Sequence, residues 1–360
     1  MSFIVSARKY RPTKFEDVVG QSAITETLKH AIENNKLAQA LLFCGPRGVG
    51  KTSCARILAR EINKSNEVDF NSSLSIFELD AASNNSVEDI RNLIEQVRIA
   101  PQENLHKVYI IDEVHMLSQA AFNAFLKTLE EPPAHTIFIL ATTEKQKIIP
   151  TILSRCQIFD FKRITILDIK NHLKKIADKE GINYNEDALF LIAQKSEGAL
   201  RDALSTFDRM VTFTQNNLSL EKVSENLNVL DYDFFFEITN GFLENNSNNC
   251  MLLLNSIIEK GYDLQVFISS LGSHFRDLLM IKSSETTILI ECGDSIKEKY
   301  KILSQKCSNA FLIDALNIYN EVENNLRFSK NQRLSIEIAL LKFCSITLLD
   351  SNLENKKKNT

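Results

Sequence analysis

The sequence contains no C-x-x-C pair, although it has seven cysteines, at 44, 54, 156, 250, 292, 307 and 344. The count is odd and the spacings are wide, which argues against a framework of disulfide bonds. We therefore predict free, mostly buried thiols in a protein of the reducing cytoplasm.

The sequence also lacks an apolar run long enough to span a bilayer. The N-terminal stretch MSFIVSARKYRP has no hydrophobic region followed by a small-residue cleavage site, so no secretory signal is predicted. Together these absences predict a cytoplasmic protein that does not use a membrane as a partner.

A general excess of positive charge is absent too, since the formal net charge is −4. This excludes a generally basic nucleic-acid binder. The charge is uneven, because residues 1–60 contain ten Lys/Arg and four Asp/Glu. That end is the better candidate for phosphate contact, although a solvated basic face would look the same.

The 360 residues are too many for one typical core and predict two or three domains. In the first half, apolar runs alternate with segments of helical spacing, which predicts a parallel sheet covered by helices on both faces. The predicted strands are 40–45, 75–80, 107–114 and 136–143, and the predicted helices are 52–62, 86–99 and 118–131. The segment 66–75 is predicted to be a surface loop. After about residue 163 we predict helices only, with no internal repeat and a polar, frayed end after residue 350.

A P-loop pattern, G-x-x-x-x-G-K-[ST], occurs as GPRGVGKT between a predicted strand and a predicted helix. Glycines allow the backbone to turn tightly around a phosphate, and the N–H groups of the loop then face the anion. The lysine reaches the β- and γ-phosphates, and the threonine can ligate Mg²⁺. The pattern predicts an ATP site made by Gly45, Pro46, Arg47, Gly48, Val49, Gly50, Lys51, Thr52 and Ser53.

Two acidic residues end the strand of VYIIDEVH, at the edge where open parallel sheets bind ligands. Asp112 is predicted to hold Mg²⁺ with Thr52, and Glu113 to orient and activate the attacking water. Acidic residues at strand ends are common, but a P-loop about sixty residues earlier favours the functional interpretation. Thr143 ends the next predicted strand and is a candidate sensor of the γ-phosphate, although threonine favours strands anyway.

Several motifs together resemble, in order, those of the gamma/tau subunits of bacterial DNA polymerase III, the clamp-loader ATPases of the AAA+ superfamily. They are ARKYRP, GPRGVGKT, ELDAAS, YIIDEVHML, NAFLKTLEEPP, ILATTEKQKIIPTILSRC and EGALRDALS. The resemblance covers nearly the whole chain, and its SRC and TLEEPP segments are typical of clamp loaders rather than of P-loop proteins generally.

This resemblance implies a RecA-like AAA+ ATPase domain at 1–164, a helical lid at 165–228, a helical collar for oligomerisation at 229–350 and a flexible tail at 351–360. It assigns adenine packing to Arg11, Pro12 and Val19, and γ-phosphate sensing to Thr143 and Arg201. The alternative for Arg201 is a surface ion pair with Asp202 or Glu197. The apolar stripes of the collar would contact sister subunits, although burial in the chain's own core explains such stripes equally well.

Arg155, in TILSRCQIF, has no acidic residue within the four positions before it. In the resembling family the arginine of SRC reaches the ATP site of the neighbouring subunit as a finger supplied in trans. Such fingers are worth about 10³–10⁵ in rate. We place Arg155 past the last strand, at the edge of the subunit. The alternative is an arginine that bonds only local carbonyls. Cys156 beside it is interpreted as a buried thiol rather than a redox centre.

The sequence departs from the family in one segment, since NKSNEVDFNSSL (63–74) holds none of the clustered cysteines that form a zinc module in many members. A structural zinc site needs about four such ligands, so we predict no zinc. The longer tau form of the family also contains segments that tether the polymerase core and the helicase. The 360-residue sequence shows no counterpart to those segments.

The function implied is ATP hydrolysis, with Mg²⁺, by a motor subunit of the DNA-directed DNA polymerase III holoenzyme, a nucleotidyltransferase complex. Its partners would be the delta and delta-prime subunits, copies of itself, the sliding beta clamp and primer–template DNA bound through phosphates. The alternatives are a non-catalytic scaffold subunit of the same loader and another AAA+ ATPase, such as a branch-migration motor. A kinase is disfavoured because the helical half offers no acceptor site.

Overall fold

The computed structural model describes residues 4–63, 75–101, 106–227, 232–290 and 292–358. Most of the predicted loop at 66–75 and of the segment without zinc ligands at 63–74 lies outside the described residues. No helix in the described part of the chain is long and apolar enough to cross a membrane.

The chain forms two compact units. The first contains residues 1–182 and 192–213, and the second contains residues 183–191 and 214–360. Each unit has a hydrophobic core of its own.

A five-stranded sheet with the order β2-β3-β4-β1-β5 forms the centre of the first unit, and all its pairings are parallel. In register, Cys44 lies opposite Thr142 and Asp80 lies opposite Asp112, so the carboxyl ends of these strands meet at one edge. The predicted parallel sheet is confirmed. Its strands are β1 (Ala40–Cys44), β2 (Ile76–Asp80), β3 (Lys107–Asp112), β4 (Thr136–Thr142) and β5 (Gln157–Asp160).

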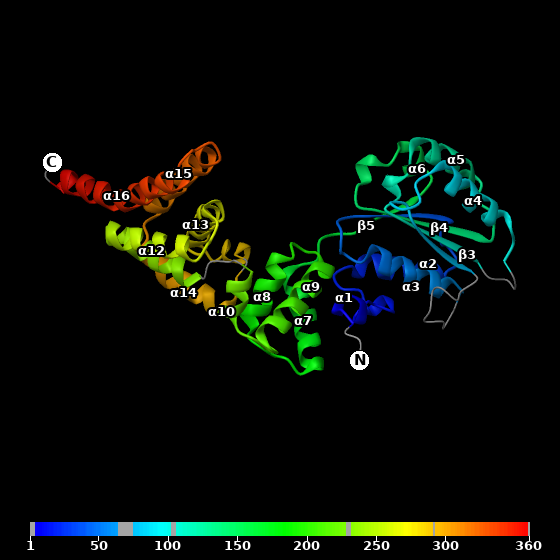
Figure 1. Ribbon diagram of the computed structural model, residues 1–360, viewed down its shortest axis with the longest axis horizontal. Helices are drawn as coiled ribbons and strands as arrows, with labels where there is room; N and C mark the ends of the chain where they lie inside the picture. Colours follow the sequence, from blue (N-terminus) through cyan, green and yellow to red (C-terminus); the bar gives the residue numbers. More distant parts are fainter. Residues whose placement is uncertain (1–3, 64–74, 102–105, 228–231, 291, 359–360) are drawn as a thin grey trace. The chain divides into compact units, whose positions relative to one another are not determined.

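Helices cover both faces of this sheet because its central strands are apolar on both sides (Figure 1). Leu41 and Phe43 of β1 pack into the core with α2 and α3, while Leu42 packs into the core with α4, α5 and α6. The helical segments of this unit are α1 (Ser6–Lys9), η1 (Phe15–Asp17), α2 (Ser22–Glu33), α3 (Lys51–Asn63), α4 (Val87–Arg98), η2 (Val114–Met116), α5 (Gln119–Glu130), η3 (Lys145–Lys147), α6 (Pro150–Leu153), α7 (Ile166–Glu180) and α9 (Leu200–Thr214), the last residue of which falls in the second unit.

The second unit is mostly helical. The residues 183–191 include a strand and the start of α8, so α8 spans the division between the units. Its elements are β6 (Asn183–Tyr184), α8 (Glu186–Lys195), β7 (Asn217–Leu218), α10 (Leu220–Asn226), α11 (Tyr232–Leu243), α12 (Ser247–Glu259), α13 (Leu264–Met280), η4 (Thr287–Leu289), α14 (Asp294–Lys306), α15 (Asn309–Leu326) and α16 (Gln332–Lys358).

Two sequence predictions were wrong in detail. Helices alone were expected after residue 163, but β6 and β7 form a short parallel pair. Arg155 was placed past the last strand, but β5 follows it and pairs with β1. Segments of two to four residues are too short for a period of two to show.

The last helix, α16, continues to Lys358, because no proline or glycine interrupts it. The flexibility expected of residues 351–360 stays a prediction.

The apolar stripes of the second unit lie largely in its own core. Phe235, Phe242 and Phe343 are buried there, as the core interpretation of these stripes predicts. One row on α16 is different, because Leu334, Ile338 and Leu341 remain 47–49% exposed.

A fully buried histidine lies at the centre of this core. The two ring nitrogens of His274 lie 3.2 Å from Thr239 Oγ1 and 2.9 Å from Tyr300 Oη. Desolvation by burial lowers the pKa of His274 from 6.5 to about 3. The folded unit therefore keeps this imidazole neutral at pH values where the unfolded chain protonates it. The corresponding stability is fully present above pH 6.5 and is lost as the pH falls from there toward 3.

We predict that lowering the pH from 7.5 to 5.0 costs the wild type about 2 kcal/mol more in free energy of unfolding than it costs His274→Gln. Glutamine keeps a donor and an acceptor for Thr239 and Tyr300 but does not titrate. Urea unfolding at both pH values, followed by tyrosine circular dichroism, measures the difference. Equal pH dependence in the two proteins would contradict the role given to His274.

Candidate nucleotide site

The P-loop connects β1 to α3 at the carboxyl edge of the sheet. Gly45, Gly48 and Gly50 have φ values of 146°, 76° and 105°, which L side chains rarely adopt. A Cβ on Gly45 would also lie 2.4 Å from the carbonyl oxygen of Phe161. Both conditions require glycine in this loop, so the spacing of the motif follows from the backbone.

Lys51 is buried beneath the loop. Its Nζ donates to the carbonyl oxygens of Gly45 and Pro46, each at 2.7 Å. Desolvation lowers the pKa of Lys51, and the nearby carboxylates of Glu113 and Asp112 oppose that shift. A desolvated ammonium is a strong attractant for phosphate, because little water screens it.

Thr52 and Asp112 meet across the base of the site. Thr52 Oγ1 donates to Asp112 Oδ2 at 2.7 Å, which joins the first turn of α3 to the end of β3. A hydroxyl and a carboxylate are the hard oxygen donors that Mg²⁺ prefers, so this pair fits the predicted metal ligands.

A cavity of about 170 Å³ opens beside the loop. It brings Arg11, Pro12 and Val19 of the N-terminal segment together with Arg201 of α9, and its lining also includes the predicted loop residues 47–53 together with Asp112 and Glu113. The backbone N–H of Arg201 donates to the carbonyl oxygen of Gly48 at 3.4 Å, so α9 contacts the loop directly.

Positive charge is concentrated around this cavity. Burial lowers the pKa of Arg11, and repulsion from Arg56 and Arg201 lowers it further. Arg11 and Arg201 both line the cavity, so an anion bound between them would relieve their repulsion. The site is therefore electrostatically suited to a polyphosphate.

The N-terminal segment is fixed to helices α7 and α9. The N–H of Ser6 donates to Asp208 Oδ2 at 2.7 Å, Lys9 Nζ lies 2.5 Å from Glu180 Oε1, and the hydroxyl of Tyr10 donates to the same carboxylate. The segment that contains the residues predicted to pack against adenine is thus bound to α7 and to α9, the helix that carries Arg201.

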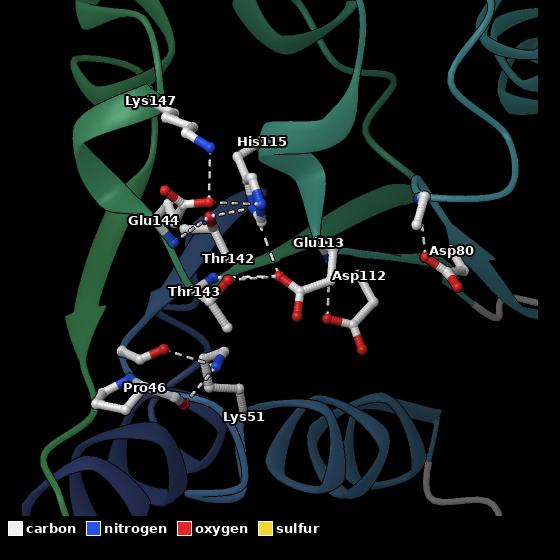
Figure 2. Close-up of polar contacts among 12 residues, drawn as sticks. Pro46, Lys51, Asp80, Asp112, Glu113, His115, Thr142, Thr143, Glu144 and Lys147 are labelled. Carbon is white, nitrogen blue, oxygen red and sulfur yellow. Dashed lines mark hydrogen bonds and ion pairs between the residues drawn. The ribbon is translucent and has the colours of Figure 1, made fainter. Parts of the chain in front are cut away.

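Glu113 follows Asp112 and has a left-handed backbone, with a φ of 48°. Its Oε2 accepts from the N–H and the Oγ1 of Thr143, at 3.2 and 3.0 Å (Figure 2). Thr143 thus lies against the predicted catalytic carboxylate, and its role as a sensor of the γ-phosphate stays a prediction.

Around Glu113 the structure adds two residues to which sequence reasoning gave no role, His115 and Glu144 (Figure 2). The imidazole lies between the two carboxylates, 3.5 Å from Glu113 Oε2 and 3.3 Å from Glu144 Oε1. The histidine directly after DEV was the available signal, but its partner Glu144 lies beyond the next strand.

Arg155 lies between α6 and β5. Its Nη1 donates to the carbonyl oxygen of Thr151 at 2.7 Å and to Ser154 Oγ at 3.2 Å, and its Nη2 pairs with the carboxylate of Glu130. Within one chain this resembles the local alternative, although Glu130 was missed because it lies 25 positions away. The role in trans involves a second subunit and stays a prediction. Burial raises the pKa of the neighbouring Cys156 thiol to about 12, which fits an unreactive thiol.

Three family models match consecutive parts of the chain. They are described as DNA polymerase III, delta subunit (residues 20–165), DNA polymerase III clamp loader subunit, ATPase lid domain (168–216), and DNA polymerase III subunits gamma and tau domain III (218–358). Among solved structures, a RuvB variant of Thermotoga maritima has a TM-score of 0.50 and 23% identity, covering 65% of this chain and 80% of that one. That likeness shows the fold alone.

Two curated relatives indicate the family more narrowly. DNA polymerase III subunit tau of Bacillus subtilis is 39% identical over 96% of this chain, which spans only 64% of that relative's length. DNA polymerase III subunit gamma of Buchnera aphidicola subsp. Schizaphis graminum is 34% identical, and the match covers 95% of this chain and 98% of that protein. With its P-loop, its acidic strand end and its matched lid, this chain belongs to the gamma/tau subunit family of DNA polymerase III.

Proposed function

We propose that this protein is an ATP-hydrolysing motor subunit of a clamp loader, which places a ring-shaped sliding clamp on primed template DNA. The observation that carries the proposal is the cluster formed by Lys51, the Thr52–Asp112 pair and Glu113 at one sheet edge. The proposed setting is the cytoplasm, and the proposed partners are the delta and delta-prime subunits and further copies of this chain.

The scaffold alternative is disfavoured by the same cluster. Scaffold subunits of clamp loaders typically lose the P-loop lysine, whereas Lys51, Thr52, Asp112 and Glu113 are all present. The alternative of a branch-migration motor has support only from a shared fold, and fold does not determine function.

In the proposed reaction, the P-loop N–H groups and Lys51 bind the β- and γ-phosphates of ATP. Mg²⁺ held by Thr52 and Asp112 would neutralise charge on those phosphates. Glu113 takes the proton of the attacking water, whose oxygen bonds to the γ-phosphorus as the bond to the β–γ bridging oxygen breaks. ADP and phosphate leave.

Arg155 would complete this site in a neighbouring subunit. A finger worth about 10³–10⁵ in rate corresponds to roughly 4–7 kcal/mol of transition-state stabilisation. An effect of that size makes hydrolysis depend on correct assembly, and DNA bound through its phosphates would favour the aligned arrangement.

We predict that Glu113→Gln lowers the hydrolysis rate measured with clamp and primed DNA by about 10²–10⁴-fold, because the general base is lost. ATP affinity should be unchanged, since the amide keeps the size of the carboxylate. Phosphate release and fluorescent-nucleotide binding measure the two quantities. Glu16→Gln, an exposed change of the same kind, is the control. A Glu113→Gln protein that hydrolyses ATP at the wild-type rate would refute the assignment.

We predict that Arg155→Ala lowers the hydrolysis rate measured with clamp and primed DNA by about 10³-fold or more. Mixing this variant with Glu113→Gln should restore part of that rate. In the mixture, one variant supplies Glu113 and the other supplies Arg155 to the same site. Glu130→Gln, which removes only the local partner of Arg155, should keep the stimulated rate. Failure of the two inactive proteins to complement each other would rule out the trans role.

We predict that the row of Leu334, Ile338 and Leu341 on α16 contacts sister subunits. A covered leucine or isoleucine contributes about 1.5 kcal/mol or more, so Ile338→Asp should weaken assembly at least about tenfold. Sedimentation velocity over a concentration series measures this. Ile302→Asp, at an exposed isoleucine of α14, is the matched control, and equal assembly of both variants would contradict the assignment.

A further inference from the structure

His115 is buried next to Glu113, and the reaction described above gives it no role. Its side chain is only 6% exposed. Nδ1 lies 3.0 Å from Thr142 Oγ1 and 3.5 Å from Glu113 Oε2, and Nε2 lies 3.3 Å from Glu144 Oε1. Each ring nitrogen thus faces an oxygen of a carboxylate, a group that only accepts hydrogen bonds, so a ring N–H on either side would be directed at Glu113 or at Glu144.

The contacts of Glu113 are concentrated on one of its oxygens. Oε2 receives both hydrogen bonds from Thr143 and faces His115, while Figure 2 shows the other oxygen turned toward the side of the site where Lys51 lies. Because the backbone of Glu113 is left-handed, no regular helix or strand sets the direction of this side chain. Its direction therefore depends on these neighbours.

The far side of the imidazole is fixed as firmly. The N–H of Glu144 donates to Thr142 Oγ1 at 3.0 Å, and Lys147 Nζ lies 2.7 Å from Glu144 Oε1. The hydrogen bond from Lys147 lowers the pKa of Glu144, so that carboxylate stays charged. Lys147 ends η3, and three residues later α6 begins at Pro150 and leads to Arg155.

We propose that His115 is a positioning residue: it braces the Glu113 carboxylate against the Glu144–Lys147 pair, and so ties it to the segment that carries Arg155. This inference rests on the role proposed for Glu113. The imidazole does not touch substrate. It acts by holding the orientation of the carboxylate that does, and each protomer would thereby set its own base and its finger through one connected segment.

The competing interpretation is a buried histidine that merely satisfies its polar neighbours and stabilises the fold. The two interpretations differ in which nitrogen matters. The amide of an asparagine at 115 reaches about as far as Nδ1, toward Thr142 and Glu113. The amide of a glutamine reaches about as far as Nε2, toward Glu144. The proposed positioning role depends most on the first contact, which reaches Glu113 itself, and less on the second, which supports the imidazole. A purely structural role does not rank the two contacts in kcat.

The experiment compares His115→Asn, His115→Gln and His115→Phe in the full chain assembled with clamp and primed DNA. We expect His115→Phe and His115→Gln to lose about 10²-fold in kcat, the size of effect that a small misplacement of a catalytic group produces. His115→Asn, which keeps the contact with Glu113 and loses only the one with Glu144, should lose less. ATP affinity should be unchanged in all three. Equal losses in Asn and Gln variants of matched melting temperature, or wild-type kcat in His115→Phe, would overturn the proposal.

A double-mutant cycle tests the link to the far side. Lys147→Met removes the partner of Glu144, and its effect on kcat should be non-additive with that of His115→Phe. Lys145→Met is the control. Lys145 lies on the same short helix as Lys147 but pairs with Asp160 of β5, so its effect on kcat should be additive with that of His115→Phe. Additive behaviour of Lys147→Met would overturn the link. Glu113→Gln distinguishes an error in the proposed function from an error in the brace. If Glu113→Gln is fully active, the role given to Glu113 is wrong. If Glu113→Gln is inactive while the His115 variants are fully active, the brace is wrong.

Discussion

The parallel register of β1, β3 and β4 is the constraint on which the site depends. Because these strands run in one direction and end level, the loop after β1, the carboxylates after β3 and the threonines at the end of β4 meet at one edge. A shift of one residue would reverse which face each side chain meets. It would separate Thr52 from Asp112, whose hydrogen bond links the helix after the P-loop to the centre of the sheet.

The electrostatics of the site follow from that convergence. Lys51 is desolvated and donates hydrogen bonds to carbonyl oxygens of the loop. Arg11 is repelled by the positive charges of Arg56 and Arg201. Desolvation of Lys51 and repulsion at Arg11 both disfavour the charged side chain, and a bound anion would favour it. These two features are thus a stronger indication of a polyphosphate ligand than the positive balance of residues 1–60, which a solvated surface would equally explain.

The parts of the site that lie in one short segment were predictable from the sequence. The glycines of GPRGVGKT predict a tight turn around a phosphate. The run of four apolar residues before Asp112 and Glu113 predicts a strand that ends at these two carboxylates. Contacts between distant segments were not predictable. Arg155 meets Glu130 across 25 positions, and His115 meets Glu144 only because β4 returns the chain beside β3. Strands as short as β5 and β6 leave no periodic signal, so they were missed as well.

The pairing of Arg155 with Glu130 bears on how a subunit behaves before it meets a neighbour. In a single chain the guanidinium of Arg155 already pairs with the carboxylate of Glu130. In an assembly it would exchange that carboxylate for the γ-phosphate of the ATP on a neighbouring subunit. Partly exposed pairs of this kind contribute about 0–1 kcal/mol, which makes the exchange nearly free. In the proposed assembly Arg155 would therefore set the rate of ATP hydrolysis but contribute little to the affinity between subunits.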